Sequence, residues 1–138
     1  MVLLRDLFIL QVVRLVLTYN FSNCNFEEIS NIYSEAIFPD LKEYLNGRTF
    51  NQIEVCDNLT DCLMKIEYHT LNPIPGCPSL PQKTFALKTK GALISQCPGY
   101  SETQRNNPQE MKQEVENICL NQTSQIQWLW FTLRQTPV

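Results

Sequence analysis

Apolar residues recur at intervals of three and four along most of the chain, which is the spacing of one face of an α-helix. The longest series lies in 107–133, where one face carries Met111, Val115, Ile118, Gln122, Ile126, Leu129 and Leu133. Asn107 and Glu110 have the spacing of a capping box, and Pro108 stands at the first helical position. The pattern therefore predicts a long C-terminal helix that begins near Asn107.

A first helix is predicted over about Asn25–Leu45. Its apolar positions are Phe26, Ile29, Tyr33, Ile37, Leu41 and Tyr44. Pro39 removes a backbone donor inside this segment, so we expect a kink, a π-type bulge near 35–39, or a break into two helices. The pair Asn46 and Gly47 is expected to end it.

Two shorter helices are predicted between these. The second covers about Leu59–Leu71, ends before Pro73, and places on one side Leu59, Leu63, Ile66 and Thr70. The third is expected to open with Ser79 and Gln82 in capping-box spacing and to end near Gln96. Its inward residues are predicted to be Phe85, Ala86, Thr89, Ala92 and Leu93. Gly91 indicates either a close helix contact or a locally weak helix.

The links between the predicted helices are 13, 8 and 13 residues long, counted over 46–58, 72–79 and 97–109. A 20-residue helix is about 30 Å long, whereas 13 extended residues reach roughly 43 Å. A long link can therefore return along the whole bundle, so that consecutive helices run parallel, and the short link suits antiparallel neighbours. We predict an all-α, up-up-down-down four-helix bundle.

Residues 1–19 are predicted to be a secretory signal peptide, leaving 20–138 as one domain. Arg5 precedes an apolar run from Leu7 to Leu17 that is too short to span a bilayer. The alternative is a buried N-terminal helix, since Arg14 interrupts the run. Cleavage is expected after Thr18 or Tyr19.

Composition excludes several classes of function. The net charge of −3 argues against nucleic-acid binding and against anionic membranes. No histidine partners a plausible nucleophile and no phosphate-binding glycine loop is present, so we expect neither an enzyme nor a cofactor. Glu110, Glu114 and Glu116 are interpreted as a solvated helix start.

Six cysteines follow the predicted signal, which is typical of a disulfide-linked secreted domain. Zinc is the alternative, but the sequence has no C-x-x-C pair and only one histidine, His69. The proposed topology brings Cys24 near Cys97, and Cys56 lies close enough to Cys62 to pair locally. Cys77 and Cys119 remain as the third pair, which requires the second link to fold along the fourth helix by two to three turns.

Three sequons, at Asn20, Asn58 and Asn121, are candidate N-glycosylation sites. They agree with a chain that passes through the secretory route.

Four stretches carry a resemblance to a known family: 17–24 (LTYNFSNC), 85–93 (FALKTKGAL), 97–104 (CPGYSETQ) and 119–130 (CLNQTSQIQWLW). With the order of the six cysteines, they resemble the interleukin-7-like short-chain four-helix cytokines over nearly the whole chain. The resemblance implies a monomer that binds a private type I cytokine receptor chain and recruits the interleukin-7 receptor alpha chain. It further implies JAK and STAT signalling in dendritic and other immune cells, and it supports the three disulfides.

The resemblance also implies two receptor surfaces. The private chain would contact helices one and four, and the alpha chain would contact helices one and three, where Lys88 and Lys90 match the family pattern. Of the basic residues that members of the family can carry near the fourth helix, this sequence has only Arg105 before it and Arg134 at its end, and Arg134 is a candidate receptor contact. Trp128 and Phe131 lie off the main stripe, and we expect them to supply apolar area for the private receptor.

Other interpretations of these residues stay open. Trp128 and Phe131 could instead pack beneath a crossover link, and a glycan on Asn121 would crowd the surface proposed for them. Lys88 and Lys90 could be ordinary solvated lysines. The rival function is a saposin-like lipid-binding domain, although such domains usually carry closely spaced cysteines at their ends.

Overall fold

The computed structural model describes residues 19–48, 55–101 and 113–136. All regular elements in these ranges are helical. In chain order they are the 3-10 turn η1 (Phe21–Asn23), α2 (Phe26–Ile32), the π-helical turn η2 (Tyr33–Ile37), α3 (Phe38–Leu45), α4 (Leu59–Leu71), the 3-10 turn η3 (Leu80–Gln82), α5 (Thr84–Gln96) and α6 (Glu116–Gln135).

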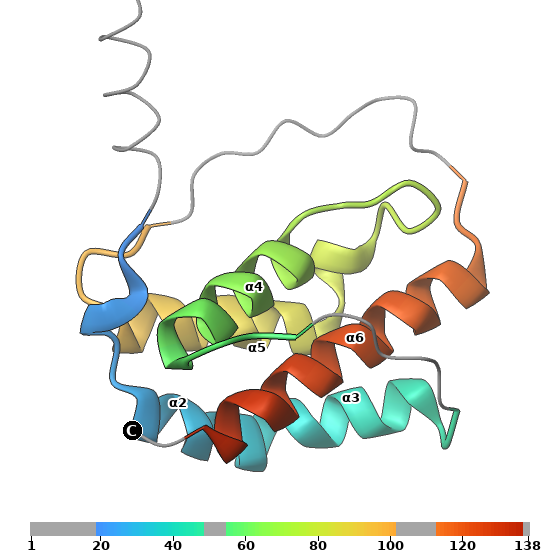
Figure 1. The fold of residues 1–138 in the computed structure, drawn as a ribbon. Helices are drawn as coiled ribbons and strands as arrows, with labels where there is room; N and C mark the ends of the chain where they lie inside the picture. The colour runs from blue at the N-terminus through green and yellow to red at the C-terminus, as the bar shows by residue number, and fades with distance from the viewer. Residues whose placement is uncertain (1–18, 49–54, 102–112, 137–138) are drawn as a thin grey trace, which may run out of the picture.

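The helices form a four-helix bundle in which α2, η2 and α3 together make the first long helix (Figure 1). This first helix and α4 run in the same direction, whereas α5 and α6 both run back the opposite way. The predicted up-up-down-down topology is therefore confirmed.

The first helix contains the π-type bulge that Pro39 led us to expect. The widened turn covers Tyr33–Ile37 and is closed by the Phe38 N–H, which donates to the Tyr33 carbonyl. Pro39 follows at the start of α3, where the missing donor is tolerated. Asn46 then adopts a left-handed conformation with φ 50°, and Gly47 follows at φ 80°, which ends the helix as predicted.

The core lies between the four helices. Its largest fully buried side chains are Trp130, Phe85, Ile29, Ile37, Leu41, Leu63, Ile66, Leu80, Leu93, Leu120, Ile126 and Leu129. Burial of about 1.5–3 kcal/mol per large apolar side chain makes this the main source of stability. The predicted inward residues of helices one to three belong to this buried set or lie partly buried at its edge.

Helix α4 has the predicted bounds, and the side-chain oxygen of Asn58 caps it by accepting from the Asp61 N–H at 2.8 Å. The predicted start of the third helix was wrong. Leu80–Gln82 form the separate 3-10 turn η3, and α5 begins at Thr84 after Lys83, which gives no side-chain cap. The Ser79 hydroxyl, which was expected to cap this helix, donates to Glu114. Gly91 is exposed, and a Cβ there would meet nothing, so no close helix contact explains it.

The predicted start of the fourth helix was also wrong, and so was its predicted inward face near that start. Residues 113–115 are not helical and α6 begins at Glu116, while the predicted cap at 107–110 and Met111 lie outside the described residues. Val115 and Ile118 are 47% and 39% exposed, and the Val115 N–H donates to the Gly76 carbonyl oxygen in the second link. The predicted stripe is confirmed at Ile126, Leu129 and Leu133. The other buried residues of α6 are Cys119, Leu120, Thr123, Ser124, Gln125 and Trp130.

The structure contains three disulfides, and they are the predicted pairs. Cys24 joins Cys97, Cys56 joins Cys62, and Cys77 joins Cys119. The third pair had required the second link to fold along α6. Because α6 begins at Glu116, Cys119 lies in its first turn, and the link reaches it without that descent.

In the described part of the chain, no helix combines the length and the apolar character that crossing a bilayer requires.

Candidate functional site

A groove of about 620 Å³ runs along the outside of the bundle between the first helix and the second half of α6. The first helix contributes Tyr33, Ser34 and Phe38, and α6 contributes Ser124, Gln127, Trp128, Phe131, Arg134 and Gln135. Three of the five predicted receptor residues therefore lie together at this groove.

Phe38 belongs to the groove but was not predicted as a site residue. The π-helical turn brings it beside Tyr33, because the Phe38 N–H closes that turn on the Tyr33 carbonyl. The centroids of the two rings lie 5.8 Å apart. An α-helical spacing would not place these two residues together, so only the position of the π-turn could have indicated the pair.

Aromatic rings dominate the apolar part of the groove. The rings of Trp128 and Phe131 stack at 5.3 Å between centroids with an interplanar angle of 20°. Phe131 is 51% exposed and Phe38 38% exposed, so both present ring surface to solvent. Exposed aromatic residues of this kind are enriched at the energetic centres of protein interfaces.

The base of the groove continues into the core through Tyr33. Its ring stacks on the buried Trp130 ring at 4.6 Å between centroids. Burial raises the pKa of Tyr33 to about 12, although the positive charge of Arg134 opposes this rise. The Arg134 guanidinium carbon lies 6.0 Å from the Tyr33 ring centroid. Among the described residues that line the groove, Arg134 alone is charged.

The other two predicted receptor residues lie on α5 and do not reach this groove. Lys88 pairs with Asp40 on α3, with 2.8 Å between Nζ and Oδ2, and its Nζ lies 3.3 Å from the Ala36 carbonyl oxygen. Lys90 is partly buried. The five residues are thus divided between the α6 side and the α5 side of the first helix.

All three sequon asparagines are exposed. Asn20 and Asn58 use their side-chain oxygens to accept from the Ser22 and Asp61 amides. Asn121 lies on the outer side of α6, seven residues and therefore about 10 Å before Trp128 on nearly the same stripe.

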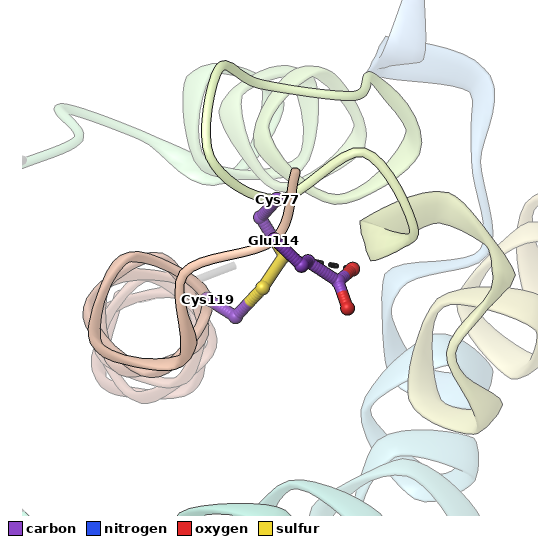
Figure 2. Close-up of side chains that lie close together, drawn as sticks. All are labelled: Cys77, Glu114 and Cys119. Carbon is purple, nitrogen blue, oxygen red and sulfur yellow. Dashed lines mark hydrogen bonds between the residues drawn. A yellow bond between two sulfur atoms is a disulfide. The ribbon is translucent and has the colours of Figure 1, made fainter. Parts of the chain in front are cut away.

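Glu114 lies beside the Cys77–Cys119 disulfide at the start of α6 (Figure 2). These three side chains are close enough to suggest a metal site, but a cystine sulfur is no thiolate and cannot act as a zinc ligand. The carboxylate of Glu114 is also already used, since it accepts from the Ser79 N–H at 3.1 Å. Glu114 and Glu116 are both exposed, as predicted for a solvated helix start, and the 73% exposed Glu116 side chain pairs with Arg48 at 3.1 Å. Glu110 lies outside the described residues.

His69 belongs to the contact between α4 and α6. The Gln122 side-chain amide donates to the His69 carbonyl oxygen at 3.1 Å and lies 3.2 Å from its Nδ1 atom. The single histidine of the chain is therefore engaged in helix packing.

An up-up-down-down four-helix bundle with three disulfides and a groove between its first and last helices is the architecture of a short-chain helical cytokine. A family model described as thymic stromal lymphopoietin matches residues 19–135. A mouse (Mus musculus) protein named thymic stromal lymphopoietin is 65% identical over 139 residues, covering 99% of both chains. The chain belongs to the thymic stromal lymphopoietin family.

Solved structures agree with this assignment. A chain from a structure titled "Cytokine receptor complex - Crystal form 2" superposes with a TM-score of 0.77 at 55% identity. A chain from "Cytokine receptor complex - Crystal form 1A" gives 0.76 at 57% identity. In both cases 87% of this chain and 100% of the other chain are covered.

Proposed function

We propose that this chain is a secreted cytokine that binds the thymic stromal lymphopoietin receptor chain and then recruits the interleukin-7 receptor alpha chain. The assembled pair would start JAK and STAT signalling in dendritic and other immune cells. Family membership and the titles of the similar solved structures support receptor binding. The two named chains and the signalling route come from the family resemblance.

The observation that carries this proposal is the aromatic groove between the first helix and α6. It presents exposed ring surface at Phe38 and Phe131 with one cation, Arg134, at the edge. A partner that inserts apolar side chains between the rings and places a carboxylate near Arg134 would complement it. We assign this groove to the private receptor chain, and the α5 side of the first helix to the alpha chain.

Surface-immobilised receptor ectodomains, each alone and then as a pair, test the assignment. Trp128→Ala is expected to raise the dissociation constant for the private chain at least about tenfold, on the order of 1.4–2 kcal/mol. Tyr68→Ala is the matched control, because Tyr68 is a 61% exposed aromatic residue on α4, away from the groove. Unchanged binding by a folded Trp128→Ala protein would refute the groove as the contact.

Recruitment of the second chain is tested in the same experiment. The alpha chain ectodomain should bind the complex of cytokine and private chain more tightly than it binds the cytokine alone. Equal affinities would contradict stepwise assembly. Binding to lipid vesicles, without binding to either ectodomain, would favour the saposin-like alternative.

Secretion requires that the predicted signal in residues 1–19 be removed. Residues 1–18 lie outside the described residues, but Tyr19 packs edge-on against Phe21 and Tyr100, at 4.9 and 5.4 Å between ring centroids. Its hydroxyl also donates to the Pro98 carbonyl. Of the two predicted cleavage positions, we therefore propose the one after Thr18, which keeps these contacts. N-terminal sequencing of the secreted chain gives the answer directly.

We also propose that Asn20, Asn58 and Asn121 carry N-glycans. Their exposure supports this, since attachment of a glycan needs an asparagine on the surface. Intact-mass measurement before and after enzymatic deglycosylation would count the occupied sites.

A further inference from the structure

Lys88 reaches across from α5 to the first helix at the point where that helix is irregular. Its Nζ atom lies 2.8 Å from Asp40 Oδ2 and 3.3 Å from the Ala36 carbonyl oxygen. Ala36 belongs to the π-helical turn and Asp40 to the first turn of α3. One ammonium group thus bridges the two helical segments that meet at Pro39.

The bridge lies where the backbone has lost a hydrogen bond. Pro39 has no N–H to donate to the turn before it, and a π-turn is widened by one residue relative to an α-turn. The Asp40 Oδ2 atom is shielded from solvent and accepts no hydrogen bond of good geometry, so the ion pair with the Lys88 ammonium 2.8 Å away is the interaction that compensates its charge. Removal of the ammonium would leave a carboxylate oxygen without its partner and the π-turn without its link to α5.

The opposite side of the same turn forms one wall of the groove. Ser34 and Phe38 line the groove, and Tyr33 supplies its base. These residues share the segment 33–40 with Ala36 and Asp40, so a shift of the π-turn relative to α5 moves the wall relative to α6. If this wall were displaced, receptor binding at the groove would weaken, although Lys88 itself does not line the groove.

We propose that Lys88 is a positioning residue, which holds the π-turn of the first helix so that the groove wall keeps its place for the receptor. This differs from the direct contact with the alpha chain that the family resemblance implied for Lys88. The binding part of the proposal rests on the proposed function, whereas the effect on the π-turn does not.

The first test is hydrogen exchange of the backbone amides in 33–41. Lys88→Met should speed exchange there about tenfold, with little change in α4 and in the second half of α6. Lys42→Met is the matched control, because Lys42 is an exposed lysine of α3, and it should leave the exchange rates unchanged. Unchanged exchange in Lys88→Met would overturn the proposal, whatever the binding data show.

The second test swaps the charges of Lys88 and Asp40 and measures receptor binding. Lys88→Asp and Asp40→Lys should each raise the dissociation rate of the private receptor ectodomain by about three- to tenfold, and the double variant should restore most of it. Binding lost only toward the alpha chain, with no rescue in the double variant, would make Lys88 a direct contact and overturn the proposal. If the unaltered chain binds neither ectodomain, the proposed function fails. The hydrogen-exchange measurement on residues 33–41 still decides the role of Lys88.

Discussion

The two halves of α6 are held to the bundle by different kinds of interaction. The first half is attached by the Cys77–Cys119 disulfide and by polar contacts, including Glu116 with Arg48 and Gln122 with His69. The second half is attached by buried apolar side chains, with Ile126, Leu129, Trp130 and Leu133 at most 1% exposed. In the first half the disulfide adds to the burial of a single large apolar side chain, Leu120, and Ile118 remains 39% exposed. The second half has no disulfide and depends on its buried stripe.

This difference explains where the groove can form. The buried stripe of the second half fixes the backbone firmly, so that Trp128 and Phe131 on its flank can remain available to a partner. In the first half of α6, polar side chains such as Gln122 and Thr123 form hydrogen bonds within the protein. If this division holds, substitutions in the buried stripe of α6 lower stability, whereas substitutions at the groove lower binding.

The largest effect is expected from Trp130→Ala. Trp130 is fully buried and stacks on Tyr33, and loss of a buried large aromatic side chain costs about 3–5 kcal/mol. We expect the free energy of unfolding, measured by chemical denaturation, to fall by about 4–5 kcal/mol. Trp128→Ala is the control, since the same residue type on the groove should change stability by less than about 1.5 kcal/mol. Equal losses would contradict the division between core and groove.

Removal of the third disulfide by Cys77→Ala with Cys119→Ala should cost slightly less, about 4 kcal/mol for two residues 42 positions apart. Hydrogen exchange should then quicken in 116–122 and stay slow in 126–133. Uniform loosening of all of α6 would show that the two halves are not held independently.

The ionisation of Tyr33, whose ring stacks on Trp130, tests the packing of the second half of α6. Its pKa is raised from 10.0 to about 12 by burial, so the folded chain disfavours the phenolate. The contribution to stability is full below pH 10 and is lost as the pH rises toward 12, by at most about 2–3 kcal/mol. Spectrophotometric titrations of the unaltered chain and of Tyr33→Phe should differ by one tyrosine that ionises late, near pH 12. A late step that persists in Tyr33→Phe would assign it elsewhere.

Gly76→Ala should have the smallest effect on stability, about 1–2 kcal/mol. Gly76 has φ +90°, and a Cβ there would also meet the Ile118 side chain. Its carbonyl oxygen accepts from the Val115 N–H at 2.7 Å, so the change should act on the first half of α6. Thermal unfolding measures the loss, with Gly91→Ala as the control, because that exposed helical position should be neutral or stabilised.

Much of the fold could be predicted from local signals in the sequence. Pro39 indicated the irregular turn of the first helix, and the link lengths indicated the parallel pairs of helices, which in turn limited the cysteine pairings. The predictions of the irregular turn and of the helix directions were right because they depend on backbone chemistry and chain length. Neither prediction needs the detailed packing of side chains.

The fourth helix shows what periodicity cannot provide. The predicted stripe was right at Ile126, Leu129 and Leu133, but it left out the buried Trp130. It also ran back through Val115 and Ile118, which are exposed. The apolar residues at its start are held by Gly76 and Cys77, which lie about 40 positions away in the sequence. The link from Lys88 to Asp40 could not be predicted for the same reason, because it depends on the distance between two helices.

The cap at Asn58 has a practical consequence for studies of its sugar. The oxygen of this amide holds the first turn of α4, while the nitrogen is the atom to which a glycan would attach. Asn58→Gln would abolish both roles at a cost of about 1 kcal/mol, so a defect in that variant would not identify the carbohydrate as its cause. Thr60→Ala erases the acceptor motif and spares the cap, and enzymatic removal of the sugar leaves an aspartate, which caps a helix equally well.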